Sequence, residues 1–459
     1  MKRKIIRINF IFLKIVVSLY GDTALFFINS DNINDMKRIL SALLLLAMTM
    51  ASHATTLRVD VTNPSKFQRT CVPVVIDLSA YGLINTATVS ENGRAGVQTS
   101  QLDDLDQDGR PDELCFLTSL APRETKSFSV ELSAQGTAAK AESQVYVEML
   151  LSNKKVKEEN KHDIYISSLS VDRGVNPYNQ LHHHGAAFEN ELVAYRIYFD
   201  HRQTVDIYGK YHQGLELRRT QFYPDNEQKQ AGFGDDILWV GNTFGLGTLR
   251  GFDGQQPTML YDVLHRSQRI VARGPIRTIV EVSDEGWLPN APEVKNPLKD
   301  DGLQPVQMEG RVDLTTRYTL HAHRRDCQVD VFISDVTAAP RFSTGIINVK
   351  NSEEYSDHHG LRGCWGTDWP VSEKDSVGHK RETVGLGICL PQQSVVSEWP
   401  ADKDNYGYEI RMRGAHLQYF ITFGSDNEDF GYHSAKDWFA YLRQWKREVA
   451  TPARVIVKE

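Results

Sequence analysis

The stretch from Leu181 to His212 reads LHHHGAAFENELVAYRIYFDHRQTVDIYGKYH, and its pattern sets the character of the whole chain. Two runs inside it, 192–200 and 205–210, alternate apolar and polar side chains with the period of two that is typical of β-strands. The residues between them, 201–203, suit a short hairpin loop. The stretch therefore predicts two antiparallel strands that bury one face and carry polar side chains on the other.

The pairing of the two strands can be predicted from the charges on their polar face. A three-residue loop opposes Tyr198 to Asp206 and Arg196 to Tyr208, whereas a five-residue loop opposes like charges. We therefore prefer the shorter loop. The resulting polar strip consists of Arg196, Tyr198, Asp206, Tyr208 and Lys210, with His212 continuing it.

Outward from this hairpin, the chain keeps a β-like pattern from Val145 almost to its end. Gly, Pro, Asn and Asp separate the runs, and no βαβ alternation indicates a parallel sheet. One convincing helix follows Ser434, and the sequence ARVIV at 453–457 indicates a last strand. Residues 145–459 are predicted to form a large antiparallel β-sandwich with one C-terminal helix. The clearest strand-like runs are 192–199, 205–210, 276–283, 312–320, 328–335, 383–390 and 416–423.

Residues 55–140 are predicted to form a separate, smaller β-sandwich. LRVDV at 57–61 and SFSVEL at 127–132 alternate apolar and polar residues, and no helical periodicity competes with them. Small and polar residues at 134–143 are typical of a linker between two domains. The fold class is therefore all-β, with two domains.

The N-terminal segment has the features of a secretory signal peptide. Met36 precedes two basic residues, a short apolar run, and small residues at the −3 and −1 positions before a cut after Ala54. Residues 1–35 are then interpreted as a mis-called extension. The mature protein is expected in the periplasm or outside the cell, without stable membrane insertion. The alternative is an N-terminal membrane anchor, although the run is short for a bilayer.

The charge balance makes nucleic acid an unexpected partner. The formal net charge is −7, and residues 1–54 carry seven Lys/Arg and three Asp/Glu, so their removal leaves −11. An acidic surface repels the phosphate backbone at long range. The five cysteines have no metal-binding spacing and are interpreted as buried apolar residues, with a Cys71–Cys115 bridge as the alternative.

An acidic loop in the first domain, DDLDQDGRPDE at 103–113, resembles a Ca²⁺ loop. Oxygen ligands at alternate positions followed by a glycine are what Ca²⁺ binding requires, although the twelfth position and the flanks exclude an EF-hand. The alternative is a turn that holds its own backbone through Asx hydrogen bonds. The candidate ligands of a structural Ca²⁺ are Asp104, Asp106, Asp108, Asp112 and Glu113.

The polar strip and the histidines suit the breaking of a uronic-acid glycan by elimination. This reaction needs a cation to neutralise the carboxylate, a base to remove the C5 proton, and an acid to protonate the leaving oxygen. The candidate catalytic residues are His183, His184, Arg196, Tyr208 and Lys210. The candidate substrate-binding residues are Glu189, Tyr198, His212, Arg277 and the two tryptophans of GCWGTDWP, Trp365 and Trp369, which are expected in an ordered loop.

Other interpretations of the same residues stay open. Glycoside hydrolysis needs two carboxyl groups facing one bond, and sugar mutarotation or epimerisation needs one acid and one base. A binding protein without catalysis is a further alternative, in which the strip is a solvated ladder and the tryptophans form a packed lid. Adjacent histidines on a strand point to opposite faces and do not by themselves make a metal site. The carboxyl candidates for hydrolysis are Glu189, Glu191, Asp235 and Asp236.

Several motifs in the same order resemble one known family. HHHGAAFENELVAYRIYFD, VDIYGK, DDILWVGNTFGLGTL, GPIRTIVEV, WGTDWP and VGLGICLP resemble the family called domain of unknown function 4861, as does the DLDQDGRPDEL loop. The resemblance implies a secreted protein of the kind common in Bacteroidetes, with a galactose-mutarotase-like β-supersandwich. It also implies an oligo- or polysaccharide partner, in the company of pectin- and uronate-degrading enzymes. It assigns no catalytic residue.

Overall fold

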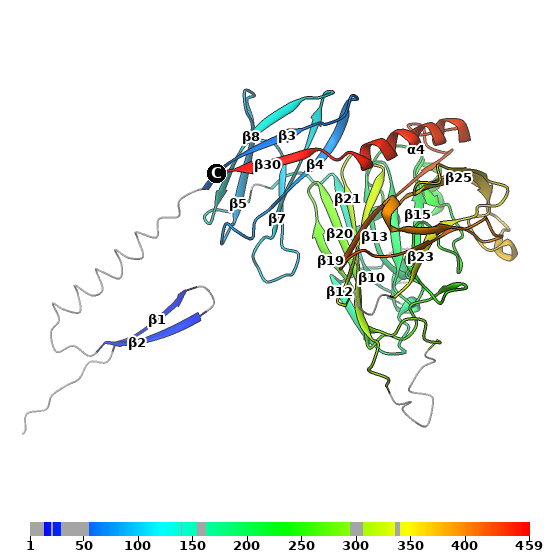
Figure 1. Ribbon diagram of the computed structural model, residues 1–459, viewed down its shortest axis with the longest axis horizontal. Helices are drawn as coiled ribbons and strands as arrows, with labels where there is room; N and C mark the ends of the chain where they lie inside the picture. Colours follow the sequence, from blue (N-terminus) through cyan, green and yellow to red (C-terminus); the bar gives the residue numbers. More distant parts are fainter. Residues whose placement is uncertain are drawn as a thin grey trace, which may run out of the picture.

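The computed structural model describes residues 13–19, 22–28, 55–138, 140–153, 162–293, 306–335 and 340–459. Over these residues the chain is built from antiparallel sheets with one long helix near its end, as predicted (Figure 1). The predicted signal peptide lies outside the described residues; ahead of it, β1 (Leu13–Leu19) and β2 (Asp22–Ile28) form a hairpin. Within the described part of the chain, no helix is both long and apolar enough to cross a membrane.

The smaller domain is a sandwich of a four-stranded and a three-stranded sheet. The strand orders are β30-β3-β8-β5 and β4-β7-β6. Leu57, Val59 and Val61 are fully buried between the sheets, as the alternation in LRVDV requires. The strands are β3 (Thr55–Thr62), β4 (Arg69–Asp77), β5 (Thr86–Glu91), β6 (Ser100–Asp103), β7 (Glu113–Leu120), β8 (Thr125–Ser133) and β30 (Arg454–Lys458).

The last strand of the chain belongs to this smaller domain. β30 lies beside β3, with Val455 opposite Val61, at opposite ends of the colour scale in Figure 1. The predicted boundary of 145–459 for the large domain is therefore wrong at its C-terminal end. The physical reason is that Val455 and Val457 cover the small core, and their strand satisfies what would otherwise be the free edge of β3.

The larger domain contains a nine-stranded antiparallel sheet. Its order is β12-β19-β20-β21-β22-β29-β26-β25-β24, and it includes five of the seven runs that the sequence predicts as strands. The strands are β12 (Ser168–Asp172), β19 (His265–Arg273), β20 (Arg277–Trp287), β21 (Val312–His321), β22 (Asp326–Ile333), β24 (Glu353–Ser356), β25 (Leu361–Asp368), β26 (Glu382–Cys389) and β29 (His416–Ser425).

Two five-stranded sheets, in the orders β16-β15-β14-β13-β9 and β18-β17-β23-β28-β27, share one apolar core with the nine-stranded sheet. Burial of this core is the main favourable term for the domain. The strands are β9 (Val145–Glu148), β13 (Gly185–Asn190), β14 (Ala194–Tyr198), β15 (Val205–Gly209), β16 (Asp235–Asp236), β17 (Arg250–Phe252), β18 (Pro257–Thr258), β23 (Phe342–Ile347), β27 (Val395–Glu398) and β28 (Asn405–Ile410). The short elements are β10 (Leu150–Leu151), β11 (Ile164–Tyr165), α2 (Leu217–Thr220), α3 (Asn226–Gln230) and the 3-10 turns η1 (Tyr178–Gln180), η2 (His182–His184), η3 (Glu373–Asp375) and η4 (Gln392–Ser394).

The long helix, α4 (Ala435–Ala450), begins as predicted, with the Ser434 hydroxyl accepting a hydrogen bond from the Asp437 backbone N–H. It buries Trp438, Leu442 and Trp445 against β25 and β26. The expectation of an ordered loop at GCWGTDWP is wrong, because most of this motif is strand β25 and α4 covers it. Trp365 is only 9% exposed and packs against Trp438, so its ring is not available to stack on a sugar.

The hairpin of β14 and β15 has the predicted faces but not the predicted pairing. Arg196 lies opposite Asp206, and Ala194 lies opposite Tyr208, which is a shift of two residues from the predicted register. A shift of two keeps every side chain on its face, so the apolar faces remain together. The observed register is favoured because it opposes a cation to an anion, and a longer connection follows Tyr198.

Candidate functional site

The polar strip lies on the outer face of the β13–β15 sheet, but it is buried and not solvated. The segment that holds α2 and α3 covers this face, and Arg196, Tyr208 and Lys210 are each at most 3% exposed. A solvated ladder of charges is therefore excluded. Because buried polar groups need hydrogen-bond partners, the hydrogen bonds show which side chains have a structural role and which can still act on a substrate.

One half of the strip, which we call the closed half, forms a complete buried network around Lys210. Its ammonium donates to Glu189 Oε2 at 2.6 Å, to the Asn190 carbonyl at 2.6 Å, and to the Gly214 carbonyl. Glu189 also accepts from the backbone N–H groups of Glu216 and Leu217, at 2.9 and 2.7 Å. All three ammonium protons are used, so Lys210 and Glu189 hold the start of α2 and do not face a substrate.

Tyr208 belongs to the closed half as well. Its hydroxyl donates to Glu216 Oε2 at 2.8 Å, and the same oxygen accepts from the Gly234 N–H at 2.9 Å. The ring has no exposed surface and packs against Phe222. The predicted acid Tyr208 is thus enclosed, because the segment after β15 folds back over it.

The other half, which we call the open half, is centred on Arg196. Its guanidinium donates to Asp206 Oδ2 at 2.6 Å, to Asp236 Oδ2 at 2.7 Å, and to the hydroxyls of Tyr198 at 3.1 Å and Tyr223 at 2.7 Å. The guanidinium carbon also lies 4.1 Å from the centre of a phenylalanine ring, that of Phe222. This cation is held rigidly between two carboxyl groups and two phenols.

Asp236 is the carboxyl group of this half that reaches the surface. Its side chain is 21% exposed, whereas that of Asp206 is fully buried. Burial raises the pKa of Asp236 to about 8; the Arg196 charge opposes the rise, and the neighbouring Asp206 carboxylate adds to it. Two carboxyl groups share one guanidinium, so Asp236 is the group that keeps a proton near neutral pH.

The three histidines form a strained turn beside the open half. His183 and His184 have left-handed backbone angles, with φ of 43° and 69°, a conformation that is uncommon for residues other than glycine. His182 and His183 are buried; their Nε2 atoms lie 3.0 Å from the Gln221 carbonyl and 3.3 Å from Glu148 Oε1. Burial lowers the pKa of both histidines to about 3, so they remain neutral. His183, a predicted catalytic residue, is enclosed.

His184 is the histidine of the turn that reaches the surface. Its ring stacks on Tyr178 with centroids 3.7 Å apart and meets the Tyr198 ring edge-on at 5.7 Å. Nδ1 lies 3.1 Å from the Tyr178 carbonyl, which fixes the proton on Nδ1 and leaves Nε2 as a lone-pair acceptor. Burial lowers the pKa of His184 to about 4, so the imidazole is neutral near pH 7 and its Nε2 is unprotonated.

The remaining predicted site residues lie outside the open half. His212 is exposed and bonds Asp429 at 2.7 Å, and Trp369 is half-buried beneath Arg381. Arg277 lies on β20 of the nine-stranded sheet, where it bridges Asp103 and Glu113 of the small domain. The expectation that Arg277 binds substrate together with the histidines is therefore wrong, because the nine-stranded sheet and the β13–β15 sheet lie between them.

The acidic loop brings together three of its five predicted ligands. One oxygen from each of Asp104, Asp106 and Asp108 lies within 4.8 Å of the others. The same side chains accept backbone hydrogen bonds, including Asp108 N–H to Asp104 at 3.1 Å and Gly109 N–H to Asp104 at 2.8 Å. Asp112 accepts from the Leu105 N–H, and Glu113 pairs with Arg277, so these two are directed elsewhere.

A family model described as domain of unknown function (DUF4861) matches residues 61–455, which is most of the chain. The chain belongs to the DUF4861 family. The match includes both sandwiches and confirms the resemblance carried by the ordered motifs. No curated protein matches the sequence.

Two solved structures are similar to this DUF4861 chain in part of their length. One is a protein in glycosyl hydrolase family 38 from Enterococcus faecalis, with 11% identity and a TM-score of 0.46. The other is an alpha-mannosidase from Enterococcus faecalis V583, with 11% identity and a TM-score of 0.43. Both alignments cover 93% of this chain, which spans only 51% and 49% of those structures. At such low TM-scores, neither likeness carries an argument.

Sequence analysis of this DUF4861 chain missed part of the open half. Tyr223 was not singled out, and Asp236 was considered only as a carboxyl group for hydrolysis. Trp239 lies three residues beyond Asp236 and is 52% exposed, which is unusual for a tryptophan. The signal available in the sequence was the pair DD followed by an aromatic residue in DDILWVG, but nothing in its spacing links it to Arg196.

Proposed function

We propose that the protein is a periplasmic or secreted lyase that cleaves uronic-acid-containing glycans by β-elimination at the open half of the strip. The observation that carries the proposal is the convergence of a neutral imidazole, a phenol, a fixed guanidinium and a carboxyl group of raised pKa, of which His184 and Asp236 reach the surface. Elimination from a uronate needs neutralisation of the carboxylate, a base and an acid, and these four groups can supply all three. The family resemblance supports a carbohydrate setting without supplying any of the roles.

Each group has a role that its surroundings favour. Arg196 and the protonated Asp236 would neutralise the substrate carboxylate, which makes the C5 proton more acidic. His184 would remove this proton through Nε2. Tyr198 would protonate the leaving oxygen, because burial raises its pKa well above the usual value and keeps it a donor, while Arg196 stabilises the phenolate that results.

The proposed step balances without any further reactant. The C5–H bond breaks and its proton moves to His184, the electron pair forms the C4–C5 double bond, and the C4–O bond breaks. The leaving oxygen takes the Tyr198 proton, which the imidazolium and solvent restore. The products are a 4,5-unsaturated uronate and a shortened glycan with a free hydroxyl group.

The carboxyl groups fit hydrolysis less well than elimination. Hydrolysis needs two carboxyl groups that both face the bond being broken. Asp206 has no exposed side-chain surface, and Arg196 and the Tyr198 hydroxyl, at 2.6 and 2.8 Å, hold it. This leaves Asp236 as the one carboxyl group of the pair that reaches solvent.

The proposal is tested by the ultraviolet absorbance of the unsaturated uronate. The 55–459 protein is incubated with pectic, ulvan-like and glucuronan substrates, with and without Ca²⁺. A rise in absorbance that is lost in the Arg196→Lys protein is expected. Release of reducing ends without a rise would establish hydrolysis, and glycan binding without any product would establish a binding protein; either result overturns the lyase.

Calcium is proposed as a structural ion of the acidic loop. Asp104, Asp106 and Asp108 offer the hard oxygen atoms that this ion prefers, and the loop belongs to the small domain, whereas the histidines belong to the large domain. The ion would stiffen the loop against the nine-stranded sheet, where Arg269 already donates to the Leu105 carbonyl at 2.8 Å. No step of the elimination depends on it.

A further inference from the structure

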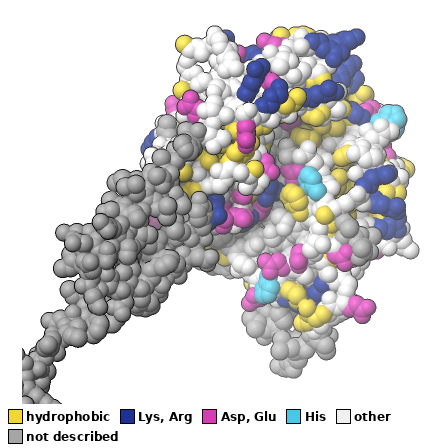
Figure 2. Space-filling view, turned by 60° about the vertical axis from the view of Figure 1, so that its left-hand side comes forward, with side chains coloured by type: hydrophobic (Ala, Val, Ile, Leu, Met, Phe, Trp, Pro, Cys, Tyr) yellow, Lys and Arg dark blue, Asp and Glu magenta, His cyan; other side chains and the backbone are white. Residues whose placement is uncertain are grey.

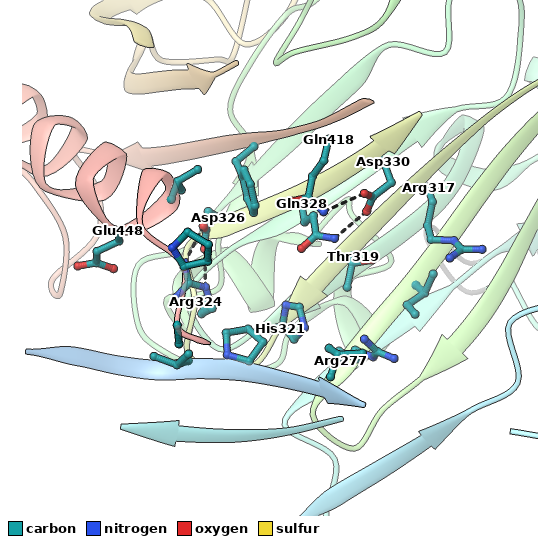
Figure 3. Close-up of a pocket in the computed structure, with 18 of the residues that line it drawn as sticks. Arg277, Arg317, Thr319, His321, Arg324, Asp326, Gln328, Asp330, Gln418 and Glu448 are labelled. Carbon is teal, nitrogen blue, oxygen red and sulfur yellow. Dashed lines mark hydrogen bonds and ion pairs between the residues drawn. The ribbon is translucent and has the colours of Figure 1, made fainter. Parts of the chain in front are cut away.

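A second polar site lies on the far side of the large domain from the histidines. The outer face of β20, β21, β22 and β29 meets strand β4 of the small domain and the end of α4 around a cleft of about 470 Å³ (Figure 3). This volume is within the range of small-molecule sites. On the molecular face shown in Figure 2, acidic, basic and hydrophobic side chains intermingle over both domains.

The floor of the cleft carries a row of planar polar side chains around Asp330. Gln328 and Gln418 donate to its two carboxylate oxygens, at 2.7 and 2.9 Å, and His416 bonds it at 2.7 Å. Figure 3 shows both amides converging on this aspartate. Because each amide donates one N–H to Asp330, the orientation of both amides is fixed, and each keeps its oxygen as an acceptor and its second N–H as a donor.

Besides the polar floor of the cleft, a buried histidine, His321, also points to a ligand. It lines the same cleft and is 5% exposed, and among the described residues its Nε2 has no hydrogen-bond partner. A buried nitrogen without a hydrogen-bond partner destabilises the fold unless a water or a ligand supplies that partner. Burial also lowers the pKa of His321 to about 3, so it presents an uncharged ring.

Three arginines of the cleft are already paired with carboxylates, and Arg69 is held by the backbone carbonyls of Thr451 and Glu448. Arg324 holds Asp326 with two bonds of 2.8 Å, and Arg277 pairs with Glu113 at 2.7 Å. Arg317 pairs with Glu281 at 2.6 Å. An anionic ligand would have to compete with the carboxylates that Arg277, Arg317 and Arg324 already hold, whereas a neutral ligand needs only the open hydrogen-bonding groups.

Apolar surface lies beside these polar groups. Phe332 is half-buried and stacks on the His416 ring at 4.8 Å, Phe420 is also half-buried, and Pro73 and Val75 line the opposite wall. Polar groups in one plane with flat apolar surface next to them match a pyranose ring, which has hydroxyls at its edge and C–H bonds on its faces.

We infer that this interdomain cleft binds a neutral sugar of one or two rings, with Gln328, Gln418 and His321 as its hydrogen-bonding partners. This site is separate from the open half and does not depend on the lyase. A sugar bound here contacts both domains, so it also fixes the small sandwich against the nine-stranded sheet.

The test is calorimetric titration of the whole protein with uncharged methyl pyranosides, cellobiose, galactobiose and xylobiose. At least one sugar is expected to bind. Gln328→Leu and Gln418→Leu are each expected to weaken that binding roughly three- to tenfold, as the loss of one hydrogen bond implies. The matched control is Gln255→Leu, in an exposed turn, which should bind as the wild type.

A measurement on the unmodified protein covers the case in which a variant misfolds. The imidazole ¹⁵N resonances of His321 should move when the binding sugar is added, and those of the exposed His265 should not. The inference is overturned if no sugar of the panel binds, or if binding leaves the His321 resonances and the affinities of both glutamine variants unchanged.

Discussion

The two halves of the polar strip are made of the same residue types on the same sheet face, yet they have different capacities. In the closed half, Lys210, Glu189 and Tyr208 satisfy one another and the backbone within 3 Å. In the open half, Asp236 reaches solvent and has a raised pKa. His184 has a left-handed backbone conformation, and its Nε2 keeps a free lone pair. The ability to act on a substrate therefore depends on which side chains keep solvent access or a free hydrogen-bonding atom, and not on how many titratable groups a segment carries.

The largest expected effect concerns the stability of the closed half. Lys210→Met removes the ammonium from the fully buried Glu189 and should lower the free energy of unfolding by about 3–5 kcal/mol, because an uncompensated buried charge remains. Chemical denaturation measures this. The matched control is Lys229→Met, which breaks the exposed ion pair with Asp235 and should change stability by about 0–1 kcal/mol. Equal effects of the two variants would show that the closed half is not structural.

The next effect concerns turnover in the open half. His184→Asn keeps a residue that tolerates the left-handed backbone but removes the base, so kcat/KM should fall by about 10²–10⁴-fold with little change in stability. Initial rates on the preferred uronate substrate measure this. His265→Asn, on the exposed side of β19, is the control and should keep its rate. A His184 variant with full activity would remove this residue from the mechanism.

The pH dependence of the free energy of unfolding tests the raised pKa of Asp236. Its folded-state pKa is raised to about 8, so the unfolded chain loses this proton first, and the associated stability is present at low pH and lost as the pH rises from about 4 to about 8. Within this window the free energy of unfolding falls by at most about 1.4 kcal/mol per pH unit. Asp236→Asn should gain stability relative to the wild type across this window, as measured by urea midpoints. Glu148, whose pKa burial also raises to about 8, acts equally in both proteins.

The same groups predict a bell-shaped rate profile. Activity should rise as His184 loses its proton near pH 4 and fall as Asp236 ionises near pH 8. Asp236→Asn should lose the alkaline limb and keep the acid limb. If the alkaline limb persists in this variant, a group other than Asp236 causes it.

The smallest expected effect concerns the acidic loop. Added Ca²⁺ should raise the melting temperature by a few degrees, since an ion that binds only the folded state stabilises it by mass action. Asp104→Asn should remove this shift, and Mg²⁺ at the same concentration should produce less of it. An unchanged melting temperature would leave the Asx hydrogen bonds as the only function of these carboxylates.

Much of the fold could be predicted from local patterns. The period-two runs became β14, β15, β20, β21, β22, β26 and β29, and the cap at Ser434 begins α4. Two features could not be predicted, because they depend on segments far apart in the sequence. β30 pairs with β3, almost 400 residues away, and Trp365 is covered by α4, which begins 70 residues further along the chain.

The candidate site could be predicted only in part for the same reason. The strip, the histidines and Arg196 were found because they are contiguous in the sequence. Which end of the strip reaches solvent depends on the segment around α2 and α3, which encloses Tyr208 completely and leaves part of Asp236 exposed. The shift of two residues in the hairpin register likewise placed Asp206 beside Arg196 and left Asp236 to complete the cluster.

The most direct test of the difference between the halves is one pair of substitutions, Tyr198→Phe and Tyr208→Phe, with turnover and unfolding measured on both proteins. Each removes a single hydroxyl from the same face of neighbouring strands. We predict that Tyr198→Phe loses turnover by about 10²-fold or more. We predict that Tyr208→Phe keeps turnover within a few fold and loses about 1–3 kcal/mol of stability. Turnover lost in Tyr208→Phe and retained in Tyr198→Phe would contradict the assignment of chemistry to the open half.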